Sequence, residues 1–498
     1  MIITGNVNGL NAVQYVASIN DKDYKHNIDQ ILYVDIDPKF NFKSEPTADG
    51  SPVLRIQGTS STLYARKNYR IYTKKTNLYL GCDKNGEGGV LQDDPVYAMS
   101  NTAAPVNCFC LKADYAESSS SHNTGFANLV QDVLTSVGDL TPAQEYKNSE
   151  YPYEVRTTVE GHPCLLFARE TLTSTPKFVG KFNFNNDKST EDVFGFLNIN
   201  GYHDTYEEEL ADAARKSLYF PEDFTSVTVE GKVYNKEAIL EILENNPTEC
   251  WEFLNNESRF GIFKDVDFTS TITETKIEED KDGNKVTTTE TRLEWLDCWE
   301  ARFPDEDVLN AAFEAGVRPV YLEAIAEWLQ STDTTEATNN PLTSSVVYNG
   351  VNYTIDNVEY RKAKFTNEVS KYFDITFLCD YYVLNDAVAG ADQRVKNMMW
   401  AFWYDPNAAE HEIMGKMRCY PIYYDNDTIL GVNNAGAIAI NWDANEETKY
   451  PNGSYVFAGH DSVIWKNVRE LLSAELANSY KKIRANMSNS DMKQYFNT

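Results

Sequence analysis

The sequence predicts an α+β protein with a β-rich amino-terminal lobe, a mainly helical carboxy-terminal lobe and a projecting β-hairpin insertion. Three observations lead to this fold class. Strand-like alternation is concentrated in residues 1–200, apolar residues at helical spacing follow residue 305, and Thr-rich segments flank an Asp-Gly turn between these parts. The predicted divisions are therefore residues 1–200, an insertion over 201–304 that carries the hairpin (269–292), and residues 305–498.

The composition fits a soluble globular protein, because 42% of the residues are apolar and 24% are charged. The net charge of −30 argues against a surface for nucleic acid or an anionic membrane, since both require basic patches. The chain has neither an apolar run of about 18 residues nor a signal-peptide pattern at Met1, so we expect no membrane span. The scattered cysteines form no C-x2-C pair, which indicates buried, reduced thiols. Abundant Tyr favours polar assembly contacts.

Strands are expected where β-branched and aromatic residues alternate with polar ones in the amino-terminal part. These segments are 31–36, 52–57, 67–72, 107–112 and 178–185. Gly58-Thr59-Ser60-Ser61, close to Lys67, is either a phosphate-side loop or an ordinary hairpin turn beside surface bases. Residues 126–134 have one apolar helical face, and the Ser/Asn cluster before them supplies N-cap candidates. Asp187 and Lys188 leave a strand together, which fits either a salt-bridged turn or the wall of a site.

The middle of the chain contains two predicted short helices and the hairpin. The helices cover residues 205–217 and 235–245, the second capped by Asn235. Two Cys-Trp-Glu triplets, at 250–252 and 298–300, are interpreted as packing anchors rather than an internal repeat, because their flanks differ. The hairpin has too few large apolar residues to bury a face by itself. It is therefore either a projecting contact element or a solvated insertion.

The carboxy-terminal part is mainly helical in this interpretation. A helix pair surrounds Gly316 and Pro319, residues 331–347 are expected to be a mobile loop, and residues 362–388 a core helix. Apolar spacing predicts a further amphipathic helix over 463–476. The polar tail from Asn486 is expected to fray.

Two motifs in this part could carry chemistry. Asp425 and Asp427 follow the apolar run 421–424, which is typical of a short buried strand. Alternation along a strand places residues i and i+2 on one face, so both carboxylates could bind one hard cation such as Mg²⁺. Upstream, Asp392 and Asn397 have the spacing of the protein-kinase catalytic loop, and a metal-binding Asp follows that loop in kinases as well. Each motif also occurs by chance in chains rich in Asp and Asn. Their joint occurrence in kinase order is what favours a site.

These motifs, together with two amino-terminal strings, resemble the CotH kinase-like family over residues 30–440. The strings are Leu54-Arg55-Ile56-Gln57-Gly58-Thr59-Ser60-Ser61 with Lys67, and Leu111-Lys112-Ala113-Asp114-Tyr115 with His122-Asn123. Three further strings are similar to large structural proteins of tailed, crAss-like gut bacteriophages that carry this domain. They are Gly180-Lys181-Phe182-Asn183-Phe184-Asn185-Asn186-Asp187-Lys188, Cys250-Trp251-Glu252-Phe253 and Tyr423-Tyr424-Asp425-Asn426-Asp427-Thr428.

The resemblance implies a CotH-like atypical kinase fold and a role for each matching position. Asp392 would be the catalytic-loop Asp; Asn397, Asp425 and Asp427 would be metal ligands; and Lys67 or Lys112 would contact the nucleotide phosphates. The implied cofactors are Mg²⁺ (or Mn²⁺) and ATP, or none if the site is vestigial. The sequence departs from the kinase pattern at two points: no His-Arg precedes Asp392, and Asn426 stands where an apolar residue is usual.

The resemblance to phage proteins implies a virion structural protein, in the tail or neck. Its partners would be other virion proteins in a homo-oligomeric ring or tail assembly, with neither nucleic acid nor a membrane span. It would be made in the host bacterial cytoplasm and located in the virion. The alternative is an active, metal-dependent CotH-like protein kinase that transfers phosphate from ATP to protein hydroxyls.

Overall fold

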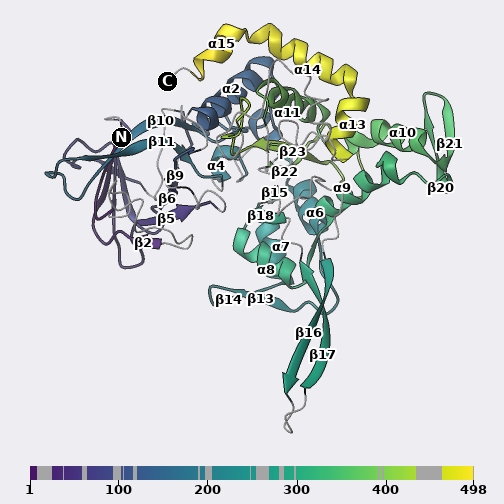
Figure 1. Cartoon of the computed structure of the whole chain (residues 1–498), viewed down its shortest axis with the longest axis horizontal. Helices are drawn as coiled ribbons and strands as arrows, with labels where there is room; N and C mark the ends of the chain where they lie inside the picture. Colours follow the sequence, from purple (N-terminus) through teal and green to yellow (C-terminus); the bar gives the residue numbers. More distant parts are fainter. Residues whose placement is uncertain are drawn as a thin grey trace.

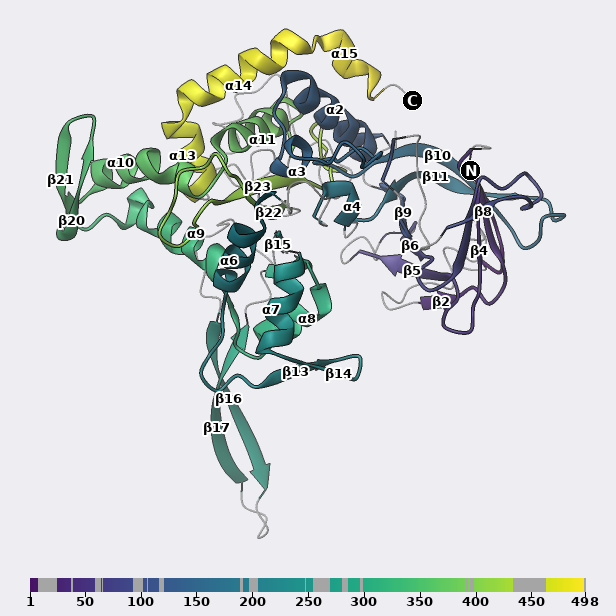
Figure 2. The same cartoon turned by 180° about the vertical axis from the view of Figure 1, so that it is seen from behind.

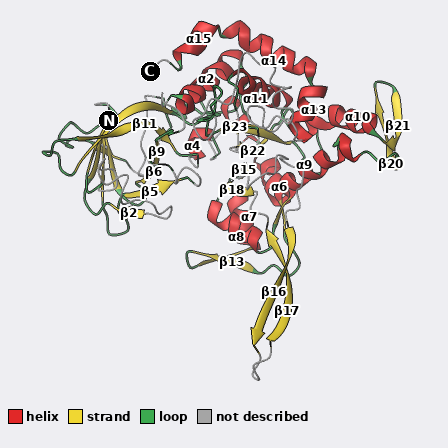
Figure 3. Ribbon diagram, in the orientation of Figure 1, coloured by secondary structure: helices red, strands yellow, loops and turns green. Residues whose placement is uncertain are grey.

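The computed structural model confirms the α+β class: strands prevail in the first part of the chain and helices in the last (Figure 3). Residues 191–192, 253, 269–279 and 285–295 are described for their backbone alone. The described residues are 1–7, 25–36, 39–58, 64, 66–92, 102–104, 106–115, 121–188, 191–196, 205–246, 248–253, 269–279, 285–295, 299–390, 393–394, 398–432 and 463–496.

The amino-terminal part is built on one large mixed sheet with the described strand order β2-β5-β6-β9-β11-β10-β1-β3-β4-β7-β8. β1 runs parallel to β10, and the remaining neighbours described in this sheet run antiparallel. The strands are β1 (Ile2–Thr4), β2 (Lys25–Asn27), β3 (Leu32–Asp35), β4 (Phe42–Glu45), β5 (Val53–Gln57), β6 (Asn68–Tyr72), β7 (Asn77–Leu80), β8 (Val90–Leu91), β9 (Cys108–Lys112), β10 (Gly161–Arg169) and β11 (Lys177–Asn186).

Alternation along the central strands gives this sheet one apolar and one polar face. Phe109 and Leu111 of β9 belong to an apolar core with Tyr69 and Ile71 of β6. Cys110 and Lys112 alternate with them and are therefore on the opposite face, where Arg70 is paired with Cys110. Every residue of β9 is buried, so both faces of the sheet are covered at this strand.

The helix that follows β9 is not part of the apolar core of the large sheet. α2 (His122–Val137) has the predicted apolar face, and it ends at Gly138, whose φ of 79° allows its N–H to close the last turn. That face joins a second core with the carboxy-terminal part of the chain, although α2 lies within residues 1–200. Two short helices, α3 (Pro142–Glu145) and α4 (Glu191–Phe194), precede and follow the β10–β11 pair.

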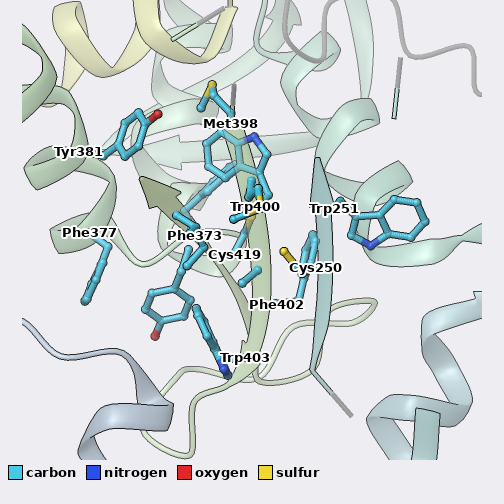
Figure 4. Close-up of a cluster of buried hydrophobic side chains, with 14 of the residues drawn as sticks. Cys250, Trp251, Phe373, Phe377, Tyr381, Met398, Trp400, Phe402, Trp403 and Cys419 are labelled. Atoms are coloured by element: carbon cyan, nitrogen blue, oxygen red, sulfur yellow. The ribbon is translucent and has the colours of Figure 1, made fainter. Parts of the chain in front are cut away.

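The second core surrounds a four-stranded antiparallel sheet in the order β18-β15-β22-β23. All seven residues of β22 and of β23 are buried. In Figure 4, side chains of β15, β22 and the segment before α11 gather around Trp400; Phe373 meets the Trp400 ring edge-on with centroids 5.5 Å apart. The strands are β15 (Glu249–Phe253), β18 (Trp299–Phe303), β22 (Met398–Tyr404) and β23 (Met417–Tyr423).

Helices enclose this sheet, and the carboxy-terminal ones pass over α2 and α11 in both views (Figures 1 and 2). The predicted N-cap is confirmed, because the Asn235 side chain accepts a hydrogen bond from the Ala238 N–H. The helices are α6 (Glu207–Ser217), α7 (Lys236–Asn245), α8 (Glu306–Glu314), α9 (Val320–Ser331), α10 (Val358–Glu368), α11 (Ile375–Ala387), α13 (Val463–Leu471), α14 (Ser473–Asn486) and α15 (Asn489–Gln494), with 3-10 turns η3 (Thr334–Glu336) and η4 (Val369–Lys371). In the described ranges, no helix is long and apolar enough to cross a membrane.

Among the described residues, three β-hairpins lie outside the two main sheets. A short antiparallel pair, β12 (Leu218–Tyr219) with β19 (Arg318–Pro319), lies between the end of α6 and the start of α9. The predicted hairpin is confirmed as β16 (Thr269–Glu279) and β17 (Lys285–Trp295), which extend well beyond the body of the molecule (Figures 1 and 2). Its Asp282-Gly283 turn lies outside the described residues. The other two are β13 (Ser226–Val229) with β14 (Lys232–Asn235), and β20 (Asn340–Tyr348) with β21 (Val351–Asp356).

Three expectations for the carboxy-terminal part are wrong. Residues 331–347 are not a loop: they contain η3 and most of β20, which turns into β21 at Asn349 and Gly350, both with positive φ. The expected core helix 362–388 is divided by η4 into α10 and α11. The tail after Asn486 does not fray, because Ser488 and Asp491 form a capping box that begins α15. The apolar alternation of residues 437–442 also predicts a strand, and these residues lie outside the described part of the chain.

Candidate functional site

The end of β9 meets the segment after β23 at an ion pair. Lys112, the last residue of β9, places its Nζ 3.3 Å from Oδ1 of Asp425. The Lys112 side chain is 7% exposed and that of Asp425 is 24% exposed, so water reaches the carboxylate more readily than the ammonium group. The pair therefore joins the polar face of the large sheet to the carboxy-terminal part of the chain.

The two carboxylates do not reach this place by strand alternation, so that part of the sequence interpretation is wrong. β23 ends at Tyr423, and Asp425 has a left-handed φ of 52°. A residue in this conformation interrupts the extended backbone of the strand, so the rule that residues i and i+2 share a face does not apply. Asp427 is nevertheless close enough for its charge to raise the pKa of Lys112.

Two side chains from other elements hold the Asp425 segment. Oδ1 of Asn123, near the start of α2, accepts a hydrogen bond of 3.1 Å from the Asn426 N–H. Nε2 of Gln393 donates to the Asp425 carbonyl over 3.1 Å. Gln393 follows Asp392 in sequence, so the two predicted motifs come together at this hydrogen bond. Asp392 and Asn397 themselves lie outside the described residues.

Lys112 is kept charged in spite of its burial. Burial is the largest influence and by itself would lower the pKa of the ammonium group, but Asp425, followed by Tyr424, Cys110 and Asp427, raises it well above its usual value. A lysine in this state acts as a fixed positive charge rather than as a base. Such a charge can stabilise an anionic group that approaches the polar face of the sheet.

A second buried lysine shares an aromatic neighbour with Lys112. The ammonium groups of Lys112 and Lys188 lie 5.7 Å and 4.8 Å from the centroid of the Tyr424 ring, within the range of cation–π attraction. Lys188 is hydrogen-bonded to the buried carboxylate of Glu252. Burial, partly opposed by Glu252 and reinforced by Arg302, lowers the pKa of Lys188.

Further charges form a layer beside these lysines. Arg70 on β6 pairs with the buried Asp187 over 2.9 Å. Arg302 on β18 contacts Glu252 and Glu300 at 2.5 Å and Glu306 at 2.6 Å. Asp187 and Lys188 are therefore both salt-bridged where they leave the strand, each with a different partner. The pKa of Asp187 is lowered, because Arg70 and Lys188 outweigh the effect of burial.

The charged layer around Arg302 was not predicted from the sequence. The two Cys-Trp-Glu triplets contained a signal, because Glu252 of the first lies on β15 opposite Glu300 of the second on the adjacent antiparallel strand β18. Both carboxylates therefore reach the same guanidinium group. The interpretation of the triplets as packing anchors did not consider the charges of these two Glu side chains. Two carboxylates on apolar strands, followed closely by Arg302, would have indicated a buried ion pair.

Lys67, the other candidate for the phosphate-contacting base, is placed differently. It precedes β6, is 4% exposed, and donates from Nζ to the Tyr64 carbonyl at 2.5 Å. Burial lowers the pKa of its ammonium group. Of the two candidates, Lys112 is the one that contacts Asp425. The turn residues Thr59, Ser60 and Ser61 lie outside the described residues.

The described residues contain only part of the expected metal site. Within the described ranges, no three His, Cys, Asp or Glu side chains are grouped as ligands for a metal ion. Asp425 and Asp427 supply carboxylate oxygens, which are the donors that Mg²⁺ prefers. A cavity of about 280 Å³, lined by residues such as Gly5, Arg169 and Lys177, lies at the far end of β10 and contains none of the predicted site residues.

Neither a comparison with protein-family models nor a search among curated proteins finds a match to this chain.

Proposed function

We propose that this chain binds Mg²⁺–ATP at the Lys112–Asp425 pair and acts as a CotH-like protein kinase. The observation that supports this best is the 3.3 Å contact between a buried strand lysine and the carboxylate of Asp425, two residues after the end of β23. Protein kinases place a lysine of the amino-terminal sheet on the nucleotide phosphates and an Asp of the carboxy-terminal lobe on the metal.

The order of elements around the pair supports the same proposal. Lys112 ends β9, which lies between β6 and β11 in the large sheet, and α2 is the next described element after β9. Kinases also place their phosphate-contacting Lys on a strand that a helix follows. Further along, α11, the residues around Gln393, β22, β23 and Asp425 have the order of the kinase catalytic loop and metal-binding Asp.

Each residue would contribute electrostatics or positioning. Lys112 would neutralise phosphate oxygens, and Asp425 and Asp427 would hold the metal ion, which shields the charge of the transferred phosphoryl group. Asn123 and Gln393 hold the backbone of the carboxylate segment. By the resemblance, Asp392 would accept the proton of the attacking hydroxyl and Asn397 would bind a second metal ion. The charged state of Lys112 and the oxygen donors of Asp425 and Asp427 fit this ligand.

The test is Mg²⁺–ATP binding and phosphate transfer by the full chain and by Lys112→Met and Asp425→Asn. Lys43→Met is the matched control, because Lys43 lies on β4 of the same sheet and pairs with Glu45 at 2.9 Å. We expect wild type and the control to bind nucleotide and the two site variants to lose binding while circular dichroism shows them folded. Binding that is equal in all four proteins, or in none, would contradict the proposed site.

A second role, as a structural component of a phage virion in the tail or neck, is favoured by the projecting β16–β17 hairpin. A two-stranded ribbon is marginally stable by itself in water, so an extended one is commonly stabilised by contacts with another chain. The sequence strings that resemble phage proteins are the reason for proposing a virion as the assembly. Purified particles should contain the chain at a fixed copy number, and cleavage between β16 and β17 should be fast in the isolated chain and slow in the particle. Equal cleavage in both would contradict a contact role.

A further inference from the structure

The carboxy-terminal strap, defined as residues 473–496, contacts α2 at both of its ends. Lys482 on α14 forms an ion pair with Asp139, which follows the end of α2. At the other end, the Phe496 ring meets the ring of His122, the first residue of α2, edge-on with centroids 6.4 Å apart. Both views show α14 and α15 passing over α2 (Figures 1 and 2). The strap therefore runs along the whole helix, from its end to its start.

The sequence of α2 permits a close contact with the strap at the first turn. Gly125 lies in this turn, although glycine is one of the least favourable residues in a helix. A Cβ at this position would collide with the carbonyl oxygen of Tyr495. Further along α2, the Tyr495 hydroxyl donates to Asp132 over 2.5 Å. The missing side chain at position 125 thus allows the backbone of the strap to lie directly against α2.

The same turn of α2 holds two parts of the candidate site. Oδ1 of Asn123 accepts a hydrogen bond of 3.1 Å from the N–H of Asn426, the residue between the two predicted metal ligands. The Thr124 hydroxyl donates over 2.8 Å to Asn183 on β11, which is paired with Lys112 on β9. The first turn of α2 is therefore in contact with both the strap and the candidate site.

The two helices of the strap are attached to different degrees. In α14, Ser479 and Ile483 are buried, and Ser479 is hydrogen-bonded to the buried carboxylate of Asp380 on α11. In α15, no residue is buried. The backbone is extended at Met487, so the two helices are separate elements. Because elements with little buried surface open locally at a lower free-energy cost than well-packed ones, α15 should leave α2 while α14 stays in place.

We infer that residues 487–496 are a positioning element for the candidate site: docked on α2, they fix its first turn and, through Asn123, the segment that carries Asp425. Their release loosens this segment. The ligand in this inference rests on the proposed function. Because the coupling between two sites is reciprocal, Mg²⁺–ATP bound at Asp425 keeps residues 487–496 docked, just as docking strengthens the binding of Mg²⁺–ATP.

The experiment is amide hydrogen exchange of the full chain, first without nucleotide. The test variant is Tyr495→Ala, and the matched control is Tyr480→Ala, which changes an exposed residue of α14. A second test variant, Gly125→Ala, displaces the strap from the side of α2 and leaves the sequence of the strap intact. Both test variants should speed exchange over residues 423–428 by about fivefold, the size expected for the loss of one hydrogen bond. The control should not, and exchange in β22 should stay unchanged in all three variants.

Unchanged exchange over residues 423–428 in the test variants would overturn the inference, as would an equal acceleration in the control or a general acceleration that includes β22. Added Mg²⁺–ATP should slow the exchange of residues 487–496 in the wild-type chain. A chain that does not bind Mg²⁺–ATP refutes the proposed function and leaves the coupling measured without nucleotide in place. A chain that binds Mg²⁺–ATP with unchanged exchange over 487–496 refutes this inference and leaves the kinase proposal in place.

Discussion

The Lys112–Asp425 pair gives a quantitative test of how burial sets the strength of this site. At 3.3 Å, two unit charges attract each other by about 5 kcal/mol at an effective dielectric constant near 20. Desolvation offsets part of this energy, and water reaches Asp425, so we expect a net coupling of about 2 kcal/mol in a double-mutant cycle. The cycle consists of Lys112→Met, Asp425→Asn and the double variant.

The two single variants should differ in their cost. Asp425→Asn leaves a buried ammonium group without its counter-charge, so it should destabilise the chain by about 3–4 kcal/mol. Lys112→Met leaves a carboxylate that water can reach, and its cost should be about 2–3 kcal/mol. The measurement is urea unfolding of each variant, followed by tryptophan fluorescence, because Trp251, Trp400, Trp403 and Trp465 lie in the buried second core.

The control cycle uses the exposed pair of Lys216 and Asp212, which is shorter, at 2.5 Å, but has side chains 63% and 52% exposed. Its coupling should be no more than about 0.5 kcal/mol. If the two cycles give equal couplings, or if Lys112→Met costs more than Asp425→Asn, then burial does not determine the strength of the pair and the reasoning is refuted.

Three further predictions concern the pH dependence, the carboxy-terminal helices and the β20–β21 turn. Burial raises the pKa of Glu249 from 4.5 to about 7, although hydrogen bonds from Ser217 and Trp251 lower it in part. Between pH 4.5 and 7 the folded state keeps this proton while the unfolded state loses it, so the free energy of unfolding should fall by about 3 kcal/mol over this range and level off above it. The Glu249→Gln variant should lack this fall and should be more stable than wild type at pH 8. A Cβ at Gly125 would lie 2.4 Å from the Tyr495 carbonyl, so Gly125→Ala should speed proteolysis after Asn486, although this change usually stabilises a helix by about 1 kcal/mol. Gly350 has a φ of 77°, so Gly350→Ala should destabilise the β20–β21 hairpin by about 1 kcal/mol, seen as faster amide exchange of residues 346–353.

Each of these predictions has an outcome that would contradict it. A Glu249→Gln variant less stable than wild type at pH 8 would mean that the buried carboxylate is favourable. In a chain shortened after Asn486, Gly125→Ala should become stabilising; the same loss of stability in both lengths would exclude the Tyr495 contact as the cause. Unchanged exchange in Gly350→Ala would show that the turn tolerates a side chain.

The sequence by itself determined the elements whose signals are local. The alternation of Cys108, Phe109, Cys110, Leu111 and Lys112 predicted a buried strand, and the structure has β9 there. The sequence likewise predicted the apolar positions of α2, the cap at Asn235 and the Thr-rich hairpin, because hydrophobic periodicity, helix capping and turn formation depend on residues a few positions apart. Asn349-Gly350 is the same kind of signal and was overlooked, which is why β20 was mistaken for a loop.

Only the tertiary structure showed that Lys112 pairs with Asp425. Lys67 precedes β6 and Lys112 is the last residue of β9, and no local pattern distinguishes the two lysines. Lys112 meets Asp425 because β9 lies between β6 and β11 and places its polar face toward a segment 313 residues away in sequence. The left-handed turn at Asp425 similarly replaced the expected strand, since hydrogen bonds from Gln393 and to Asn123 hold the segment. Such contacts depend on how distant elements pack. For that reason periodicity and spacing could indicate which charged residues matter, but not which of them pair with one another.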